Sequence, residues 1–211
     1  MAFSSVEYVS LMLAFGVGAV APGPDFAMVL RQSIVHGRRA AVFTSAGIAA
    51  AIFVHGAYTI FGIGLIVGQS ILMFTLLKFA GAGYLLWLGI SALRAPTPHS
   101  PNPPDASSGQ DMTATKAFTR GFLTNLLNPK AVLFFAALFT TLVDAQTAAL
   151  IKGMYVTHMS VMLFVWFVLV SYFFTAPGVR NVFFRLGKWF NRLTGTVFIF
   201  LALGIALSPR Q

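Results

Sequence analysis

The chain has 211 residues, of which 57% are hydrophobic and only 9% are charged. An ordinary soluble domain carries about 25% charged residues. This composition therefore excludes a soluble globule and indicates a polytopic membrane protein. The sequence contains no cysteine, which excludes disulfide exchange, thiolate metal sites and iron–sulfur clusters.

Six apolar stretches follow one another along the chain. They cover residues 6–30, 40–67, 71–93, 121–143, 149–177 and 193–208. A bilayer is crossed by about 20 apolar residues in a helix, and an open sheet in lipid leaves backbone groups unpaired. We therefore expect an all-α membrane protein with six transmembrane helices. Pro22-Gly23-Pro24 breaks the first of them and Asn128-Pro129 breaks the fourth.

The net charge of +9 has a clear distribution along the chain. Most of the basic residues fall in the first, third and fifth connections: Arg31, Arg38, Arg39, Arg94, Lys116, Arg120, Arg180, Arg185, Lys188 and Arg192. Because Lys and Arg accumulate in cytoplasmic loops, both termini are predicted to face outward, into the periplasm. The basic charge thus reflects membrane topology, and we expect no nucleic-acid partner.

Two connections have distinctive compositions. Residues 95–115 contain five prolines among Ser, Asn and Thr, which predicts a flexible cytoplasmic linker between residues 1–94 and residues 116–211. Residues 180–192 place aromatic side chains among four basic ones. That pattern fits a helix lying in the inner membrane interface, or equally a plain positively charged loop.

The two halves of the chain resemble each other. With a shift of 105 residues, Gly16 aligns with Gly121, Pro24 with Pro129 and Asp25 with Lys130. Toward the end of each half the shift grows, and Gly81 aligns with Gly195 at 114 residues. Each half carries three predicted spans, an odd number, so the halves would lie in opposite orientations. Inverted three-helix repeats with broken helices at matching positions are typical of secondary transporters.

The predicted helix breaks are candidate binding sites. Pro22, Gly23 and Pro24 interrupt one helix, whereas Asn128 and Pro129 combine an N-cap residue with a favoured first helical residue. Freed backbone groups and helix ends suit a zwitterion, because an N-terminal end attracts a carboxylate and free carbonyls attract an ammonium group. The alternative is a kink retained for packing.

Asp25 and Lys130 are the most costly residues to place in lipid. The repeat relates them, so we expect them to lie close together and to pair when the site is empty. Substrate or a proton would then compete for one of the two charges. The alternatives are a static ion pair, or a role for Asp25 as a helix cap only.

His55 and His158 fall in the second and fifth spans, which the repeat makes equivalent. As a pair they are candidates for proton transfer, or for ligation of a haem or metal. A structural hydrogen bond to a neighbouring group is the third interpretation.

At these residues the sequence resembles the LysE/RhtB family of amino-acid exporters, over nearly its whole length. The first span carries Pro22-Gly23-Pro24-Asp25, and the connection after it carries Gly37-Arg38-Arg39. The remaining matches are Lys78, Gly81, Tyr84, Leu85 and Gly89 in the third span, and Phe118, Gly121, Asn125 and Asn128-Pro129-Lys130 in the fourth. Ala41 and Ala51 depart from the family, in which glycine is expected at these positions.

The resemblance implies an exporter in the bacterial inner membrane that moves amino acids or close derivatives by proton antiport. It implies no enzyme activity and no cofactor, and it leaves a homo-oligomer possible. The implied substrate-binding residues are Pro22, Gly23, Pro24, Asp25, Asn125, Asn128, Pro129 and Lys130. The candidates for proton coupling are Asp25, His55 and His158. A neutral substrate such as homoserine or threonine is favoured, because Asp25 is the only acid well inside a span.

Two other functions remain open from the sequence. A metal-cation exporter of the wider superfamily would need carboxylates and histidines gathered in the membrane, and we predict no metal site here. A membrane haem or redox protein would depend on His55 and His158 alone.

Overall fold

The computed structural model describes the chain apart from residues 1–3, 70, 96–111, 174–176 and 208–211. The described residues form seven helices and the turns between them. They are α1 (Ser5–Val20), α2 (Pro24–Gln69), α3 (Ile71–Arg94), α4 (Ala114–Leu126), α5 (Pro129–Leu142), α6 (Ala149–Phe173) and α7 (Pro177–Leu207). The all-helical class predicted from the sequence is confirmed. The predicted linker lies mostly outside the described residues.

Two of these helices are long and apolar enough to cross a membrane: Pro24–Gly62 within α2, and α6. The pair α4 and α5 gives a third candidate if it is counted as one span bent by 59°. Two further apolar helices, Ser5–Val20 and Phe79–Arg94, are shorter. The described helices therefore provide two or three spans by length and composition.

Both predicted helix breaks are present. After α1 ends at Val20, α2 begins at Pro24 with Asp25 in its first turn. After α4, the Asn128 side chain caps α5 by accepting a hydrogen bond from the Lys130 backbone N–H at 3.0 Å, and Pro129 opens the helix. These are the roles that Asn and Pro favour at a helix start.

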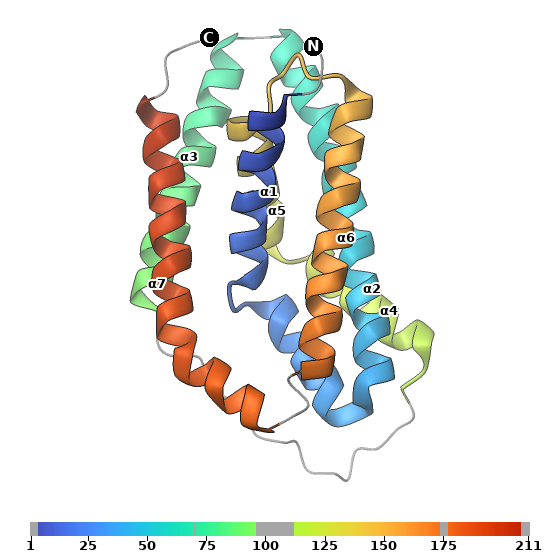
Figure 1. Cartoon of the computed structure of the whole chain (residues 1–211). Helices are drawn as coiled ribbons and strands as arrows, with labels where there is room; N and C mark the ends of the chain where they lie inside the picture. Colours follow the sequence, from blue (N-terminus) through green and yellow to red (C-terminus); the bar gives the residue numbers. More distant parts are fainter. Residues whose placement is uncertain (1–3, 70, 96–111, 174–176, 208–211) are drawn as a thin grey trace.

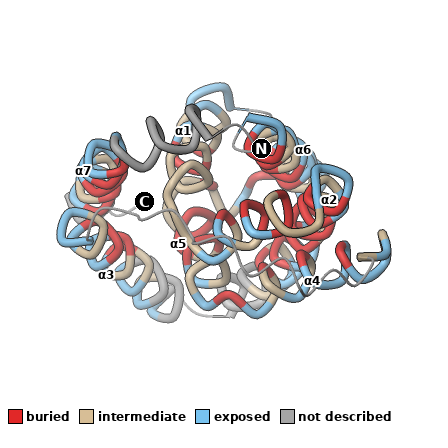
Figure 2. Tube along the Cα trace, turned by 90° about the horizontal axis from the view of Figure 1, so that it is seen from below, coloured by how far each residue is buried: buried red, intermediate tan, exposed pale blue. Residues whose placement is uncertain are grey.

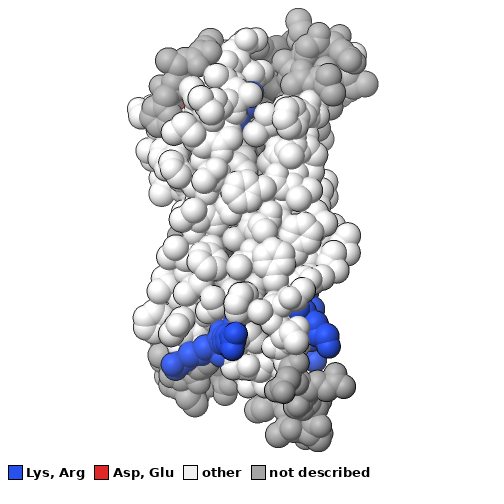
Figure 3. All heavy atoms as spheres, turned by 90° about the vertical axis from the view of Figure 1, so that its right-hand side faces the viewer, with Lys and Arg blue, Asp and Glu red and all other residues white. Residues whose placement is uncertain are grey.

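A sharp kink divides α2 into two arms. Gly37 has φ 82°, a left-handed conformation that costs glycine little and other residues more. The basic residues Arg38 and Arg39 follow at this turn and are exposed. In the space-filling view, Lys and Arg gather toward the same end of the molecule (Figure 3). The kink thus occupies the position at which the sequence predicts the first connection.

The helices form two groups around a centre (Figure 1). α3 and α7 pack side by side, α2 packs against α4 and α6, and α1 and α5 lie between the two groups. Buried residues line the surfaces between neighbouring helices in each group (Figure 2). The broken ends of α1 and α5 therefore lie at the centre of the molecule.

Glycines set the closest helix crossings. A side chain at Gly47 of α2 would overlap the Phe118 carbonyl of α4, and one at Gly121 would overlap the Thr44 carbonyl. The Thr44 hydroxyl also donates to the Ala117 carbonyl at 3.2 Å. Small residues that let helix backbones approach this closely are common at helix contacts in membranes.

The sequence allowed either a helix or a loop for residues 180–192. In the structure these residues are helical and continuous with the last apolar stretch in α7.

Candidate functional site

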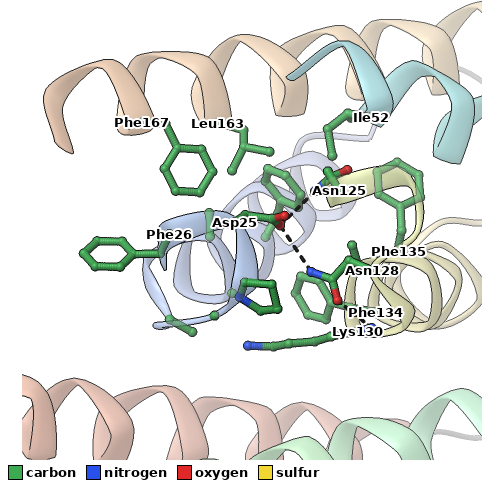
Figure 4. Close-up of a pocket in the computed structure, with 17 residues that line it drawn as sticks. Asp25, Phe26, Ile52, Asn125, Asn128, Lys130, Phe134, Phe135, Leu163 and Phe167 are labelled. Atoms are coloured by element: carbon green, nitrogen blue, oxygen red, sulfur yellow. Dashed lines mark hydrogen bonds between the residues drawn. The ribbon is translucent and has the colours of Figure 1, made fainter. Parts of the chain in front are cut away.

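A cavity lies where the two helix breaks meet (Figure 4). Its free volume is about 60 Å³, room for a few water molecules. Its polar lining comprises Asp25, Asn125, Asn128 and Lys130. Its apolar lining includes Phe15, Ile52, Phe134, Phe135, Leu163 and Phe167. The structure thus brings both predicted half-sites to one cavity, with Gly23 and Pro24 in its wall.

Asp25 is held at one carboxylate oxygen only. Asn125 Nδ2 donates to Asp25 Oδ2 at 2.9 Å, and Asn128 Nδ2 donates to the same atom at 3.4 Å. The other oxygen, Oδ1, is buried and has no hydrogen-bond partner among the residues that the structure describes. Because buried polar atoms are usually paired, an orphaned acceptor facing a cavity is a candidate ligand contact.

Lys130 lies beside this carboxylate, and their charges interact, but no salt bridge joins them within the described part of the chain. The direct Asp25–Lys130 pair expected from the sequence is therefore not formed; the two asparagines hold the carboxylate instead. The Lys130 side chain extends from α5 along the edge of the cavity, on the side that faces α7 and α3 (Figure 4). Its Nζ would be 3.7 Å from a Cβ at Gly23.

Lys130 also lines a second, larger cavity of about 370 Å³. Its wall is formed by the α1–α2 break with Pro22, by Pro129 and Leu133 of α5, and by residues of α3 and α7. The α3 and α7 residues are Tyr84, Trp87, Leu88, Ser91, Ala92, Asn191, Thr194 and Phe198. Since Ala21 and Lys130 border both cavities, the two cavities lie next to each other.

Helix ends place partial charges of both signs beside the smaller cavity. The first turns of α2 and α5 line it through Pro24, Asp25 and Lys130, and α1 and α4 end beside it. A helix N-terminus carries a partial positive charge and a C-terminus a partial negative charge. Together with Asp25 and Lys130, this arrangement provides separate regions for an anionic and a cationic group.

His55 is fully buried and belongs to a hydrogen-bond chain that starts at Asp25. His55 Nε2 lies 3.0 Å from Asn125 Oδ1, and Nδ1 lies 3.0 Å from the Tyr58 hydroxyl. Tyr58 in turn lies within donating distance of the Val132 carbonyl on α5, at 3.2 Å. Sequence reasoning missed Tyr58, although its spacing of three residues from His55 on one helix was an available signal.

His158 lies elsewhere. Its Nδ1 is 3.1 Å from the Tyr8 hydroxyl of α1, and the side chain is exposed. No contact of His158 with His55 is found among the described residues. The same part of the chain contains no group of three or more His, Asp or Glu side chains placed to hold a metal ion.

At the end of the molecule opposite the Gly37 kink, Glu7 of α1 bonds to the turn between α5 and α6. Its carboxylate accepts from the Asp144 backbone N–H at 2.9 Å and from the Thr147 hydroxyl at 3.1 and 3.2 Å. These bonds tie α1 to the turn between α5 and α6. These contacts lie at the end of the molecule opposite the kink at Gly37.

The model of the LysE type translocator family matches residues 16–208, nearly the whole chain. The chain belongs to the LysE type translocator family. This confirms the resemblance seen in the sequence and makes the chain a transporter of the membrane rather than an enzyme. The matched region includes both helix breaks and every polar residue of the two cavities.

Relatives with named activities cover most of the chain. The threonine efflux protein of Escherichia coli K12 is 26% identical over 201 residues, 95% of this chain and 98% of the relative. That of Salmonella typhi is 29% identical over 210 residues, 94% and 99% respectively. The homoserine/homoserine lactone efflux protein of Salmonella typhimurium is 34% identical over 128 residues, 61% of this chain and 60% of the relative. No solved structure matches.

Proposed function

We propose that this protein exports threonine, homoserine or another small neutral amino acid from the cytoplasm in exchange for protons. The observation that carries the proposal is the small cavity, which combines a half-satisfied carboxylate with a lysine and two helix N-termini. The names of the relatives supply the substrate class, since they include threonine and homoserine efflux proteins.

The cavity is complementary to a zwitterion. The substrate ammonium group binds the open Oδ1 of Asp25, whose other oxygen is fixed by Asn125 and Asn128. The substrate carboxylate binds Lys130 and the N-terminus of α5. The surrounding side chains are mostly phenylalanine and aliphatic residues, so they offer no second carboxylate to a cationic side chain. This favours neutral substrates.

In the same proposal the protein has six membrane-crossing segments in two inverted halves, with both termini in the periplasm of the inner membrane. The kink at Gly37 divides the first two segments, and the paired breaks at Pro24 and Pro129 support the repeat. The larger cavity along α3 and α7 is then the entry route from the cytoplasm, because it reaches Lys130 from the end that carries Arg94.

The test is efflux from proteoliposomes loaded with threonine, homoserine, valine and lysine, with a proton gradient imposed or omitted. We expect gradient-stimulated release of the hydroxylated amino acids and little release of lysine. The Lys130→Ala variant is expected to lose this release while remaining folded. If folded wild-type protein shows no gradient-dependent release of any of the four, export of amino acids by proton antiport is wrong.

A further inference from the structure

The hydrogen-bond chain from Asp25 to Tyr58 has few allowed proton arrangements. An ionised carboxylate only accepts hydrogen bonds, so the Asn125 amide must turn its NH₂ group toward Asp25. The amide oxygen of Asn125 then faces His55 Nε2 at 3.0 Å. Because that oxygen is an acceptor, Nε2 must carry a hydrogen. Ionised Asp25 thereby fixes the tautomer of a histidine two hydrogen bonds away.

The other nitrogen of His55 faces a group that can either donate or accept. The Tyr58 hydroxyl has one hydrogen and two acceptors within reach, His55 Nδ1 at 3.0 Å and the Val132 carbonyl at 3.2 Å. If Tyr58 donates to Nδ1, His55 is neutral. If Tyr58 donates to Val132, its oxygen accepts from Nδ1–H, and His55 is an imidazolium. In both states every polar hydrogen of the His55 ring and the Tyr58 hydroxyl is bonded to an acceptor.

We propose that His55 carries the transported proton and that Tyr58 is the positioning residue that accommodates both of its protonation states. On protonation, one proton binds Nδ1 and the Tyr58 O–H turns from Nδ1 to the Val132 carbonyl. On release, the proton leaves Nδ1 and the hydroxyl turns back. No other covalent bond forms or breaks. This inference rests on the proposed proton antiport and assigns its proton site.

The chain also explains why proton and substrate would exclude each other. An imidazolium on the far side of Asn125 adds positive charge near Asp25 and competes with the substrate ammonium group for that carboxylate. Within the described part of the chain, the other ionisable groups facing this region are Lys130 of α5 and Tyr58 itself. From α6 the cavity receives Leu163 and Phe167, which do not titrate. By thermodynamic linkage, each cation weakens the binding of the other by the same factor.

The tautomer is measured without substrate, by ¹⁵N NMR of histidine-labelled protein in nanodiscs over a pH series. The His55 signals are assigned by their loss in His55→Gln. We expect neutral His55 with hydrogen on Nε2 at high pH and an imidazolium at low pH. Neutral His55 with hydrogen on Nδ1, or no protonation between pH 5 and pH 8, would overturn the proposal.

The role of Tyr58 is tested by Tyr58→Phe, which removes only the hydroxyl. The imidazolium loses the acceptor for its Nδ1–H, and an unsatisfied charged donor costs more than an unsatisfied neutral acceptor. The His55 transition is therefore expected to move to lower pH. Tyr172→Phe is the matched control, because Tyr172 lies against Arg38 and does not belong to the hydrogen-bond chain from Asp25 to Tyr58. An unchanged transition in Tyr58→Phe would remove Tyr58 from the proposal.

Threonine binding against pH then connects the proton site to transport. In wild-type protein the affinity is expected to fall as pH falls, by up to about tenfold per pH unit below the midpoint for one competing proton. His55→Gln should lose this dependence, whereas His36→Gln should retain it. An unaltered pH dependence in His55→Gln would overturn the assignment. Absence of threonine and homoserine binding at every pH would instead count against the substrates proposed above.

Discussion

At the scale of single residues, the Asp25 carboxylate combines rigidity with an open acceptor. Two asparagine amides fix Oδ2, and Oδ1 stays buried and unbonded. A buried charge that lacks a hydrogen bond lowers the free energy of unfolding by roughly several kcal/mol when no other group compensates it. A binding role explains why such a group stands at the start of α2, where a simple helix cap would have no reason to leave one oxygen unpaired.

The Asp25→Asn variant tests that role. It keeps the size of the side chain but removes the charge that, in the proposed function, binds the substrate ammonium group. We expect efflux to fall at least about tenfold, since a lost charge-assisted hydrogen bond is worth about 1.5–3 kcal/mol, with normal insertion and an unfolding temperature close to that of the wild type. Asp144→Asn, in the turn between α5 and α6, is the matched control and should transport normally. Wild-type efflux by Asp25→Asn would show that the carboxylate is not needed.

The residues of the cavity were predictable from the sequence, but their bonding was not. Asp25, Asn128 and Lys130 stood out because polar and ionisable groups near proline breaks are rare in apolar segments, whereas Asn125 came from the resemblance to the LysE/RhtB family. The bonding depends on how α4 crosses α2, which places the Asn125 amide between Asp25 and His55. No spacing within one helix encodes that crossing.

At the scale of helices, local sequence rules predicted the helix breaks, whereas the contacts of the two histidines depend on tertiary packing. The breaks at Pro24 and at Asn128-Pro129 follow from local rules and appear where predicted. The repeat related His55 to His158 by equivalence, but equivalent positions need not be neighbours. His55 bonds to α4, whereas His158 bonds to Tyr8 of α1.

The crossing of α2 and α4 depends on a glycine at position 47. A methyl group there would overlap the Phe118 carbonyl of α4, and backbone atoms cannot rotate away. We expect Gly47→Ala to lower the free energy of unfolding by about 1–3 kcal/mol, as overpacking does, and to weaken the Asn125–His55 contact. Thermal unfolding in detergent measures this effect.

Gly83→Ala is the matched control for that substitution. Gly83 lies in α3, and a Cβ there would meet no atom within 4 Å. Since alanine favours helix by up to about 1 kcal/mol over glycine, this variant should be neutral or slightly more stable. Equal stability of the Gly47→Ala and Gly83→Ala variants would show that the helix crossing tolerates a methyl group.

At the scale of the whole molecule, the two ends differ. Glu7 ties α1 to the turn that carries Asp144 and Thr147 at one end. At the other end the larger cavity runs along α3 past Ser91 to Lys130. An alternating-access transporter needs such a difference, because only one side of the central site is open at a time. In the proposed topology, the Glu7 contacts lie on the periplasmic side and the larger cavity lies on the cytoplasmic side.

Cysteine labelling tests both the orientation and the open side, and the chain is suited to it because it contains no native cysteine. With Ser91→Cys, a membrane-impermeant maleimide should label inverted vesicles, in which the cytoplasmic face is outside. Labelling of right-side-out vesicles should be at least about tenfold slower, which corresponds to an equilibrium bias of about 1.4 kcal/mol between the two accessible states. Gln146→Cys, in the turn beyond α5, should show the opposite preference. If both cysteines react from the same side, the proposed topology or the assignment of the larger cavity as the cytoplasmic entrance is wrong.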